Sequence, residues 1–427
     1  MTRIRKRANY ILLAIALITT VLLIITSDFS RILTGSIEVA TYDYPTTENF
    51  HTDTVNAIIS RINETRIEET LKHLGETQGR ARYYNSKHGL KTALQVHDIL
   101  KVFANRNPNL FSAEIITHDW LQPSLIFKIN STTSNVHPDG IIVVGCHMDS
   151  INYSILPSSK PTGVDDNLSG VVTLLEAINL LTSSPITDGT GMLKNALEFH
   201  FYSGEELAAK GSHTLIKNNY YDNEPVKHIL AMLQQDMTGY SMNPTHEMGL
   251  ITDYASTTLN EFIKSVIDVF CGVGYKETRL NYAASDHVSS LFYGYPASYV
   301  LEAPIEDVNP FIHSNKDTIE KIDFNHVAEH VKLVCGFALE LSLAQISPIF
   351  VPHQRDFVDF TILDFILLMC LNETWRFVVS VLLFAFLSAS VSLMVVEQKI
   401  SVVEQLRRSS SAEKLLIQIE EGKAHAT

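Results

Sequence analysis

The sequence predicts an α/β fold, with a mostly parallel central sheet covered by helices on both faces and a transmembrane helix near each end of the chain. Four short apolar runs of the strand type, at 141–146, 196–202, 229–234 and 297–301, indicate the sheet. Helical patterns lie between them, and strands that alternate with helices are typical of parallel sheets. Two longer uncharged apolar segments near the chain ends indicate the membrane helices.

Helical periodicity accounts for much of the chain between these strands. Residues 51–105 are predicted to be helical, with amphipathic stretches at 68–74 and 92–103 that would pack on the sheet. Residues 169–181 carry apolar side chains at helical spacing and are predicted to form the helix after the first of the four strands. We assign residues 45–350 to one catalytic domain, because 427 residues with 45% hydrophobic content can bury a large core even with two segments set aside for lipid.

Charge and cysteine content exclude some classes of function. The 47 acidic residues against 33 basic ones, a net charge of -14, argue against nucleic-acid binding. The four cysteines contain no Cys-x-x-Cys pair, so a structural zinc finger is not indicated. They lie too far apart to define a disulfide framework, and Cys146 is interpreted as a buried strand residue.

Acids and histidines follow the predicted strands or lie in loops, where a metal site could collect them. In parallel sheets, ligands bind at the carboxyl ends of the strands. Imidazoles and carboxylates without a thiolate suit zinc. The candidate residues are His147, Asp149, Asp165, Asp166, Asn167, Glu205, Glu206, Asp236 and His313.

These residue types fit a hydrolytic centre with two metal ions. Two divalent cations about 3.5 to 4 Å apart need a bridging carboxylate, for which Asp166 is the natural candidate. In the pair Glu205-Glu206, one carboxylate can bind metal while its neighbour acts as general base toward a water whose pKa the metal lowers to about 7. Asp149 is placed to accept the second ring N–H of His147 and so to orient that ring.

Each feature alone also has an ordinary interpretation. The His147 segment could be a surface histidine beside an acidic turn, residues 165–167 a solvated turn, and the glutamate pair the acidic first turn of a helix. Their occurrence together, in this order, favours the metal site. We interpret Glu302 as an ordinary acid after a strand, and Asp286 and His287 as supporting residues.

Six segments resemble the signature segments of the co-catalytic di-zinc aminopeptidase family of metallopeptidases, typified by secreted bacterial leucine aminopeptidases. They occur in collinear order within residues 65–345, at 145–150, 163–170, 203–206, 235–238, 285–287 and 312–318. The resemblance implies the zinc aminopeptidase, or phosphorylase/hydrolase-like, fold and two zinc ions per chain. It implies that one zinc is held by His147, Asp166 and Asp236, and the other by Asp166, Glu206 and His313.

The same resemblance implies the remaining roles. Glu205 would be the general base, Asp149 the partner of His147, and Tyr282 a residue near the substrate. The peptide bond from Asp166 to Asn167 would be cis. The chain departs from several secreted relatives at Leu280 and Ala284, which stand where those relatives have a pair of cysteines.

The function expected from these residues is a membrane-anchored zinc aminopeptidase that acts on peptides with a free amino terminus. The arginine patch of the carboxypeptidase branch is not evident in the sequence. Two alternatives on the same fold are a non-catalytic membrane receptor or assembly factor, which would normally have lost a ligand or the base, and a glutaminyl cyclase, which keeps one working zinc. Retention of all five ligands and the glutamate pair favours hydrolysis.

The flanking basic residues predict the membrane topology. Residues 1–10 are basic and precede the apolar segment 11–26, which we interpret as an uncleaved signal anchor; a cleaved signal peptide is the alternative, but no small-x-small site follows it. Residues 377–396 form the second predicted span, and Lys and Arg residues follow it in the tail, 397–427. Both termini are therefore predicted to be cytosolic.

The intervening domain is expected to be lumenal or extracellular, in a vacuole or lysosome, in the endoplasmic reticulum or at the cell surface. Sequons at Asn63, Asn130, Asn152 and Asn372 lie in this part of the chain and predict a glycoprotein, whereas a glycan on Asn167 would block the metal cluster. Residues 357–369 are apolar but too short for a third span, and we interpret them as interfacial or packed. Oligomeric state is not indicated.

Overall fold

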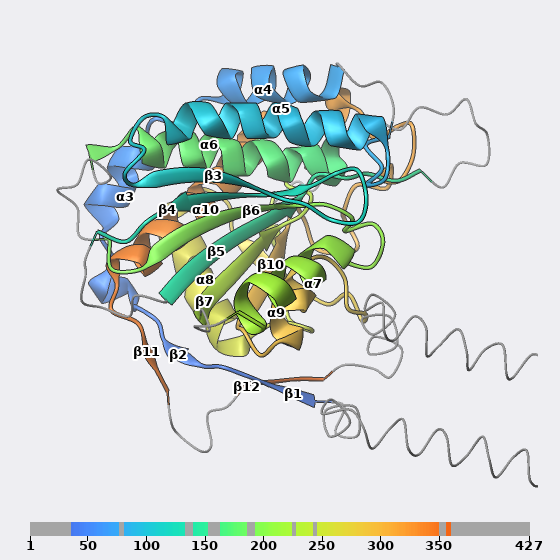
Figure 1. The fold of residues 1–427 in the computed structure, drawn as a ribbon. Coiled ribbons are helices and arrows are strands. Elements are labelled where there is room, and N and C mark those ends of the chain that lie inside the picture. The colour runs from blue at the N-terminus through green and yellow to red at the C-terminus, as the bar shows by residue number, and fades with distance from the viewer. Residues whose placement is uncertain are drawn as a thin grey trace, which may run out of the picture. The chain divides into compact units, whose positions relative to one another are not determined.

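The computed structural model describes residues 36–76, 81–132, 140–152, 163–185, 193–223, 228–241, 246–349 and 356–359. A central eight-stranded sheet has the order β3-β4-β6-β5-β7-β10-β8-β9 (Figure 1). In that order the strands are β3 (Phe111–Ile116), β4 (Ser124–Ile129), β6 (Ala196–Tyr202), β5 (Gly140–His147), β7 (His228–Gln235), β10 (Ala297–Leu301), β8 (Met248–Ile251) and β9 (Tyr275–Thr278).

The four predicted strands are confirmed as the parallel centre of this sheet. β6, β5, β7 and β10 run parallel to one another, and β8 and β9 are parallel to each other. The pairs β3–β4, β4–β6 and β8–β10 are antiparallel. All eight residues of β5 are buried, as expected for a strand that is covered on both faces.

Helices cover both faces of the sheet, as predicted. The larger layer is formed by α3 (Thr52–Ile59), α4 (Glu64–Glu76), α5 (Lys87–Ala104), α6 (Gly170–Thr182), α8 (Thr257–Phe270) and α10 (Phe324–Leu343). On the other face lie α7 (Lys210–Ile216) and α9 (His287–Phe292) (Figure 1). The predicted helical segment 51–105 corresponds to α3, α4 and α5, and the predicted helix 169–181 corresponds to α6.

Two small antiparallel ribbons lie outside the central sheet. β1 (Ser36–Val39) pairs with β12 (Asp356–Asp359), and β2 (Tyr42–Asp43) pairs with β11 (Ser347–Pro348). β1, β2 and β12 lie beyond the predicted span 45–350. Residues 357–359, at the start of the segment 357–369 that was interpreted as interfacial or packed, pair with β1 as part of β12. The rest of that segment lies outside the described residues.

The predicted membrane segments 11–26 and 377–396, and the tails 1–10 and 397–427, lie outside the described residues. Within the described ranges, the length and apolar character needed to cross a bilayer do not occur together in any helix.

The link between β5 and α6 carries the central acids. Residues 164–169 form an irregular helical turn in which Asp166 and Asn167 have non-helical dihedral angles, and the peptide bond between these two residues is cis. The Oδ1 atom of Asn167 accepts hydrogen bonds from the amides of Gly170 and Met237, at 2.9 and 3.1 Å, and its Nδ2 donates to the carbonyl of Gln235. Asn167 therefore ties the turn to the end of β7.

The hydrogen bonds of Asn167 require a glycine at position 170, because a side chain has no room there. A Cβ atom on Gly170 would meet the side chain of Asn167 and would lie 2.6 Å from the carbonyl oxygen of Gln235. We expect Gly170→Ala to lower the free energy of unfolding by about 1–3 kcal/mol, as overpacking does, and to displace Asp166. Chemical denaturation measures the loss. Gly75→Ala is the matched control, since its Cβ would meet Leu168 at an ordinary 3.7 Å, and an equal loss in both variants would contradict this account.

Candidate metal centre

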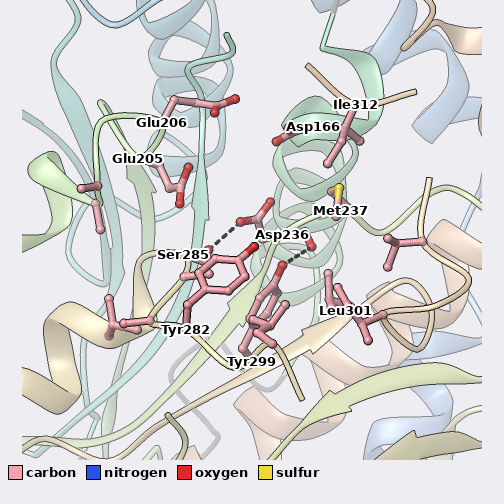
Figure 2. A pocket seen from close by; sticks show the side chains of 18 of the residues that line it. Asp166, Glu205, Glu206, Asp236, Met237, Tyr282, Ser285, Tyr299, Leu301 and Ile312 are labelled. Atoms are coloured by element: carbon pink, nitrogen blue, oxygen red, sulfur yellow. Dashed lines mark hydrogen bonds between the residues drawn. The ribbon is translucent and has the colours of Figure 1, made fainter. Parts of the chain in front are cut away.

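The carboxyl ends of the parallel strands bring the predicted site residues together, and most of these residues line one cavity. His147 ends β5, the pair Glu205-Glu206 follows β6, and Asp236 follows β7. His313 comes from the loop after β10 and has a left-handed backbone. Figure 2 shows Glu205, Glu206, Asp166 and Asp236 at this cavity.

Two groups of three side chains could each hold a metal ion, and they share Asp166. One group is His147, Asp166 and Asp236, and the other is Asp166, Glu206 and His313; within each group the ligand atoms lie within 4.8 Å of one another. These are the two sets that the sequence resemblance implies.

The distances show how Asp166 joins the two groups. Its Oδ1 lies 3.2 Å from Nε2 of His147, and its Oδ2 lies 2.9 Å from Nε2 of His313. The same imidazole nitrogens lie 3.1 Å from Oδ1 of Asp236 and 3.0 Å from Oε2 of Glu206. Each oxygen of Asp166 thus faces a different group, which is the arrangement that a bridging ligand requires.

The donor atoms fit divalent cations such as zinc. The pKa of His313 is raised to about 11 because, against the effect of burial, the carboxylates of Asp166 and Glu206 stabilise its charged form. Burial and the neighbouring Asp166 raise the pKa of Glu206 to about 7. Imidazole nitrogens with carboxylate oxygens are a donor set that zinc accepts, and a bound cation displaces any proton that its ligands hold.

Glu205 lies next to the two groups but belongs to neither. Its Oε2 is 3.9 Å from Nε2 of His147, and its side chain is 16% exposed. Burial, together with the nearby carboxylates of Asp236, Asp286 and Glu206, raises its pKa well above the usual range. A carboxylate in this position can exchange a proton with a molecule bound in the cavity.

Asp149 is buried, and its carboxylate lies near His147 but makes its hydrogen bonds with the glutamate pair. Its Oδ1 lies 3.6 Å from Nδ1 of His147, which is beyond hydrogen-bond distance, whereas its backbone oxygen lies 3.2 Å from that nitrogen. The carboxylate instead accepts the amide N–H groups of Glu205 and Glu206, at 3.1 and 3.2 Å. Asp149 thus holds the glutamate pair against the end of β5.

Several supporting residues were not predicted from the sequence. Ser285 donates to Oδ2 of Asp236 at 2.5 Å, and the hydroxyl of Tyr299 donates to the carbonyl of Asp236 at 3.0 Å. Asp317 accepts the amides of Asp165 and Asp166, at 2.8 and 3.1 Å. Ser285 and Asp317 lie inside segments that resemble the family, so the resemblance could have identified them as site residues. Tyr299 lies within an apolar strand, and no feature of the sequence marks it as a site residue.

Glu302 was predicted to be an ordinary acid after a strand, but the structure shows a buried residue with a structural role. It is 1% exposed, and its two oxygens accept the amides of Asn309, at 2.9 Å, and Tyr240, at 2.6 Å. The side chain of Asn309 donates to Asp165, so Glu302 helps to organise the loops around the site. Asp286 is a supporting residue as predicted, because it is buried and accepts a hydrogen bond from Gln234.

An apolar cavity of about 350 Å³ opens beside the acids. Its walls come mainly from the segments after β7, β9 and β10. Tyr282, predicted to lie near the substrate, lines the cavity and is 58% exposed (Figure 2). The other apolar lining residues include Met237, Leu280, Val288, Tyr299, Leu301, Ile305, Val308 and Ile312.

Comparison with known proteins identifies the family. The family model described as "Peptidase family M28" matches residues 124–338, about half of the chain. The chain belongs to peptidase family M28. A probable aminopeptidase of Saccharomyces cerevisiae is 36% identical to this M28 peptidase over 306 residues, which cover 71% of this chain and 79% of the relative. Leucine aminopeptidase 1 of Aspergillus fumigatus is 38% identical, over 67% of this chain and 74% of the relative.

Solved structures agree with this family. The LapA aminopeptidase of Legionella pneumophila superposes with a TM-score of 0.62 at 26% identity, over 71% of this chain and 77% of that one. An aminopeptidase from Aneurinibacillus, at 14% identity and a TM-score of 0.53 over 69% of this chain and 98% of that one, shows the shared fold. The resemblance inferred from the six sequence segments is therefore confirmed, as is the prediction of a hydrolase of the aminopeptidase type.

Proposed function

We propose that this M28 peptidase is a zinc aminopeptidase that removes amino-terminal residues from peptides, with Glu205 as its general base. The observation that carries the proposal is the position of Glu205, which lies beside two metal-binding groups that share Asp166 and is a member of neither. Relatives named leucine aminopeptidase support the same reaction.

We further propose two zinc ions per chain. His147, Asp166 and Asp236 would hold one, and Asp166, Glu206 and His313 the other. Zinc bound there supplies Lewis acidity, which polarises a carbonyl oxygen and makes a bound water more acidic.

The protein residues then move the proton. Glu205 accepts a proton from the attacking water at its carboxylate and delivers it to the nitrogen of the departing peptide. Asp149 keeps the glutamate in place through the amide of Glu205, so its role in the reaction is to position the base.

The shape of the cavity supports a substrate class. A side chain that enters it meets Met237, Leu301 and Ile312, so an apolar amino-terminal residue gains contact area there, at roughly 25 cal/mol for each Å² removed from water. We propose that peptides with a free amino terminus and a bulky apolar first residue are the preferred substrates. Tyr282 at the exposed side of the cavity would contact the bound peptide.

We also propose that the protein is anchored in a membrane by 11–26 and 377–396, with cytosolic termini and the peptidase domain on the other side. The pairing of β1 with β12 supports this topology, because Ser36 is opposite Asp359 and both chain ends therefore leave the domain from neighbouring positions. The linker from residue 27 to 35 can extend to about 30 Å at most, so β1 would lie close to the bilayer.

Metal content tests the two groups separately. We expect purified wild-type protein to bind two zinc ions per chain and His313→Ala to bind about one, because the group with His147 remains intact. Elemental analysis after dialysis against zinc measures both. His246→Ala is the control, since that exposed histidine lies outside both groups. Equal zinc content in wild type and His313→Ala would contradict the second site.

Hydrolysis tests the base. We expect Glu205→Gln to lower kcat for a leucyl anilide roughly 10²–10⁴-fold, because general-base catalysis is lost while both metal-binding groups remain. Release of the chromophore, with and without chelator, gives the rate, and elemental analysis confirms that zinc is retained. Glu48→Gln, at an exposed glutamate, should match wild type.

In the same assay wild type should hydrolyse the leucyl anilide faster than a lysyl or aspartyl one, because the cavity walls are apolar. Full activity in Glu205→Gln would remove the proposed base. Equal rates on all three anilides would remove the proposed preference.

Membrane fractions test the topology. We expect the full chain to stay in the pellet after alkaline carbonate extraction, because two apolar spans hold it there. We expect Asn63→Gln and Asn130→Gln each to remove the mass of one glycan, since both side chains are exposed and would face the lumen. Release of the intact chain by carbonate, or an unglycosylated protein in a secretory host, would refute the proposed orientation.

A further inference from the structure

Arg82 is a buried cation beside the candidate metal centre. Its residue surface is 1% exposed, and among the residues that the structure describes it is the one Lys or Arg that is buried. Burial of a charged group costs several kcal/mol unless other groups compensate for it. Other groups must therefore compensate for the burial of the charge on Arg82.

The contacts of Arg82 join two segments that carry metal ligands. Its Nε donates to the carbonyl of Met148 at 3.0 Å, and its Nη2 donates to the carbonyl of Gly163 at 2.7 Å. Its backbone amide donates to Oγ of Ser150 at 3.0 Å. Met148 follows the ligand His147, and Gly163 begins the turn that contains Asp166.

Charge gives a second reason. The carboxylates of Asp317, Asp166, Asp149 and Glu206 all act on Arg82. Burial lowers the pKa of Arg82 to about 10, so the side chain is still charged at neutral pH. A set of buried carboxylates repels itself strongly in a medium of low dielectric constant, and one cation among them offsets part of that repulsion.

We propose that Arg82 is the counter-cation of the metal-free centre. It holds the carboxylates in their ligand positions before metal arrives, and its charge becomes dispensable once divalent cations are bound. The proposal rests on the proposed zinc function, and it makes Arg82 a positioning residue that acts through Asp166 and its neighbours.

A role of Arg82 as a neutral tether would give a different result. A tether through the two carbonyl contacts would act in both forms, so its loss would destabilise the metal-free and the zinc-bound protein equally. Loss of the charge would destabilise the metal-free form more, because bound zinc supplies far more positive charge than Arg82 does. By thermodynamic linkage, a variant that weakens only the metal-free form binds zinc more tightly than wild type.

Two substitutions separate charge from tethering. Arg82→Gln keeps donors for the carbonyls but removes the charge, whereas Arg82→Lys keeps the charge and loses the planar fork. Thermal unfolding of the full chain in detergent, at neutral pH, is measured with excess zinc and with chelator. Zinc affinity is measured by competition with a chromophoric chelator.

We expect the fall in Tm of Arg82→Gln to be at least twice as large in chelator as in zinc, with zinc bound several-fold more tightly than by wild type. A variant that folds only with zinc is the limiting form of this result. The fall in Tm of Arg82→Lys should be similar in chelator and in zinc. An equal fall in Tm of Arg82→Gln in chelator and in zinc, or weaker zinc binding than by wild type, would overturn the proposal.

Failure of the inference about Arg82 can be distinguished from failure of the proposed function. If wild type binds two zinc ions and hydrolyses leucyl anilide while Arg82→Gln shows equal losses, only the inference about Arg82 fails. If wild type binds no zinc, the proposed function fails first.

Discussion

The arrangement of the site depends on one carboxylate that faces two imidazoles. Asp166 presents one oxygen to His147 and the other to His313, which come from different segments of the chain. A single side chain can satisfy both only if its backbone is held firmly. That backbone is held on one side by Asp317, which accepts the amides of Asp165 and Asp166. On the other side it is held by Asn167, which accepts the amides of Gly170 at the end of the turn and of Met237 after β7.

Buried acids have a structural role throughout this end of the sheet. Asp149 accepts two backbone amides from the glutamate pair, Asp317 accepts two from the Asp166 turn, and Glu302 accepts two from the neighbouring loops. Loops lack the regular hydrogen bonds of strands and helices, so their buried amides need acceptors. A carboxylate satisfies two amides at once and gives each loop a defined position. The negative charge that accumulates in this way is consistent with a site for cations.

The cavity combines two environments that suit a peptidase. One wall carries the acids and His313, and the others carry apolar side chains such as Met237, Leu301 and Ile312. Removal of water from the apolar part strengthens electrostatic interactions at the polar wall. The same cavity therefore places an apolar surface next to ionisable side chains.

The sequence by itself determined the four central strands, the helix after the first of them, and all the residues of the two groups that could hold a metal ion. Those features are local: an apolar run shows a strand through its periodicity, and the ligands lie in short segments that resemble a known family. The tertiary structure alone decided the antiparallel edges of the sheet, the pairing of β1 with β12, the buried position of Glu302 and the contacts of Arg82. It also showed that Asp149 holds the glutamate loop more closely than it approaches His147. These depend on partners far away in the chain, and the periodicity of a segment carries no information about which distant backbone it will meet.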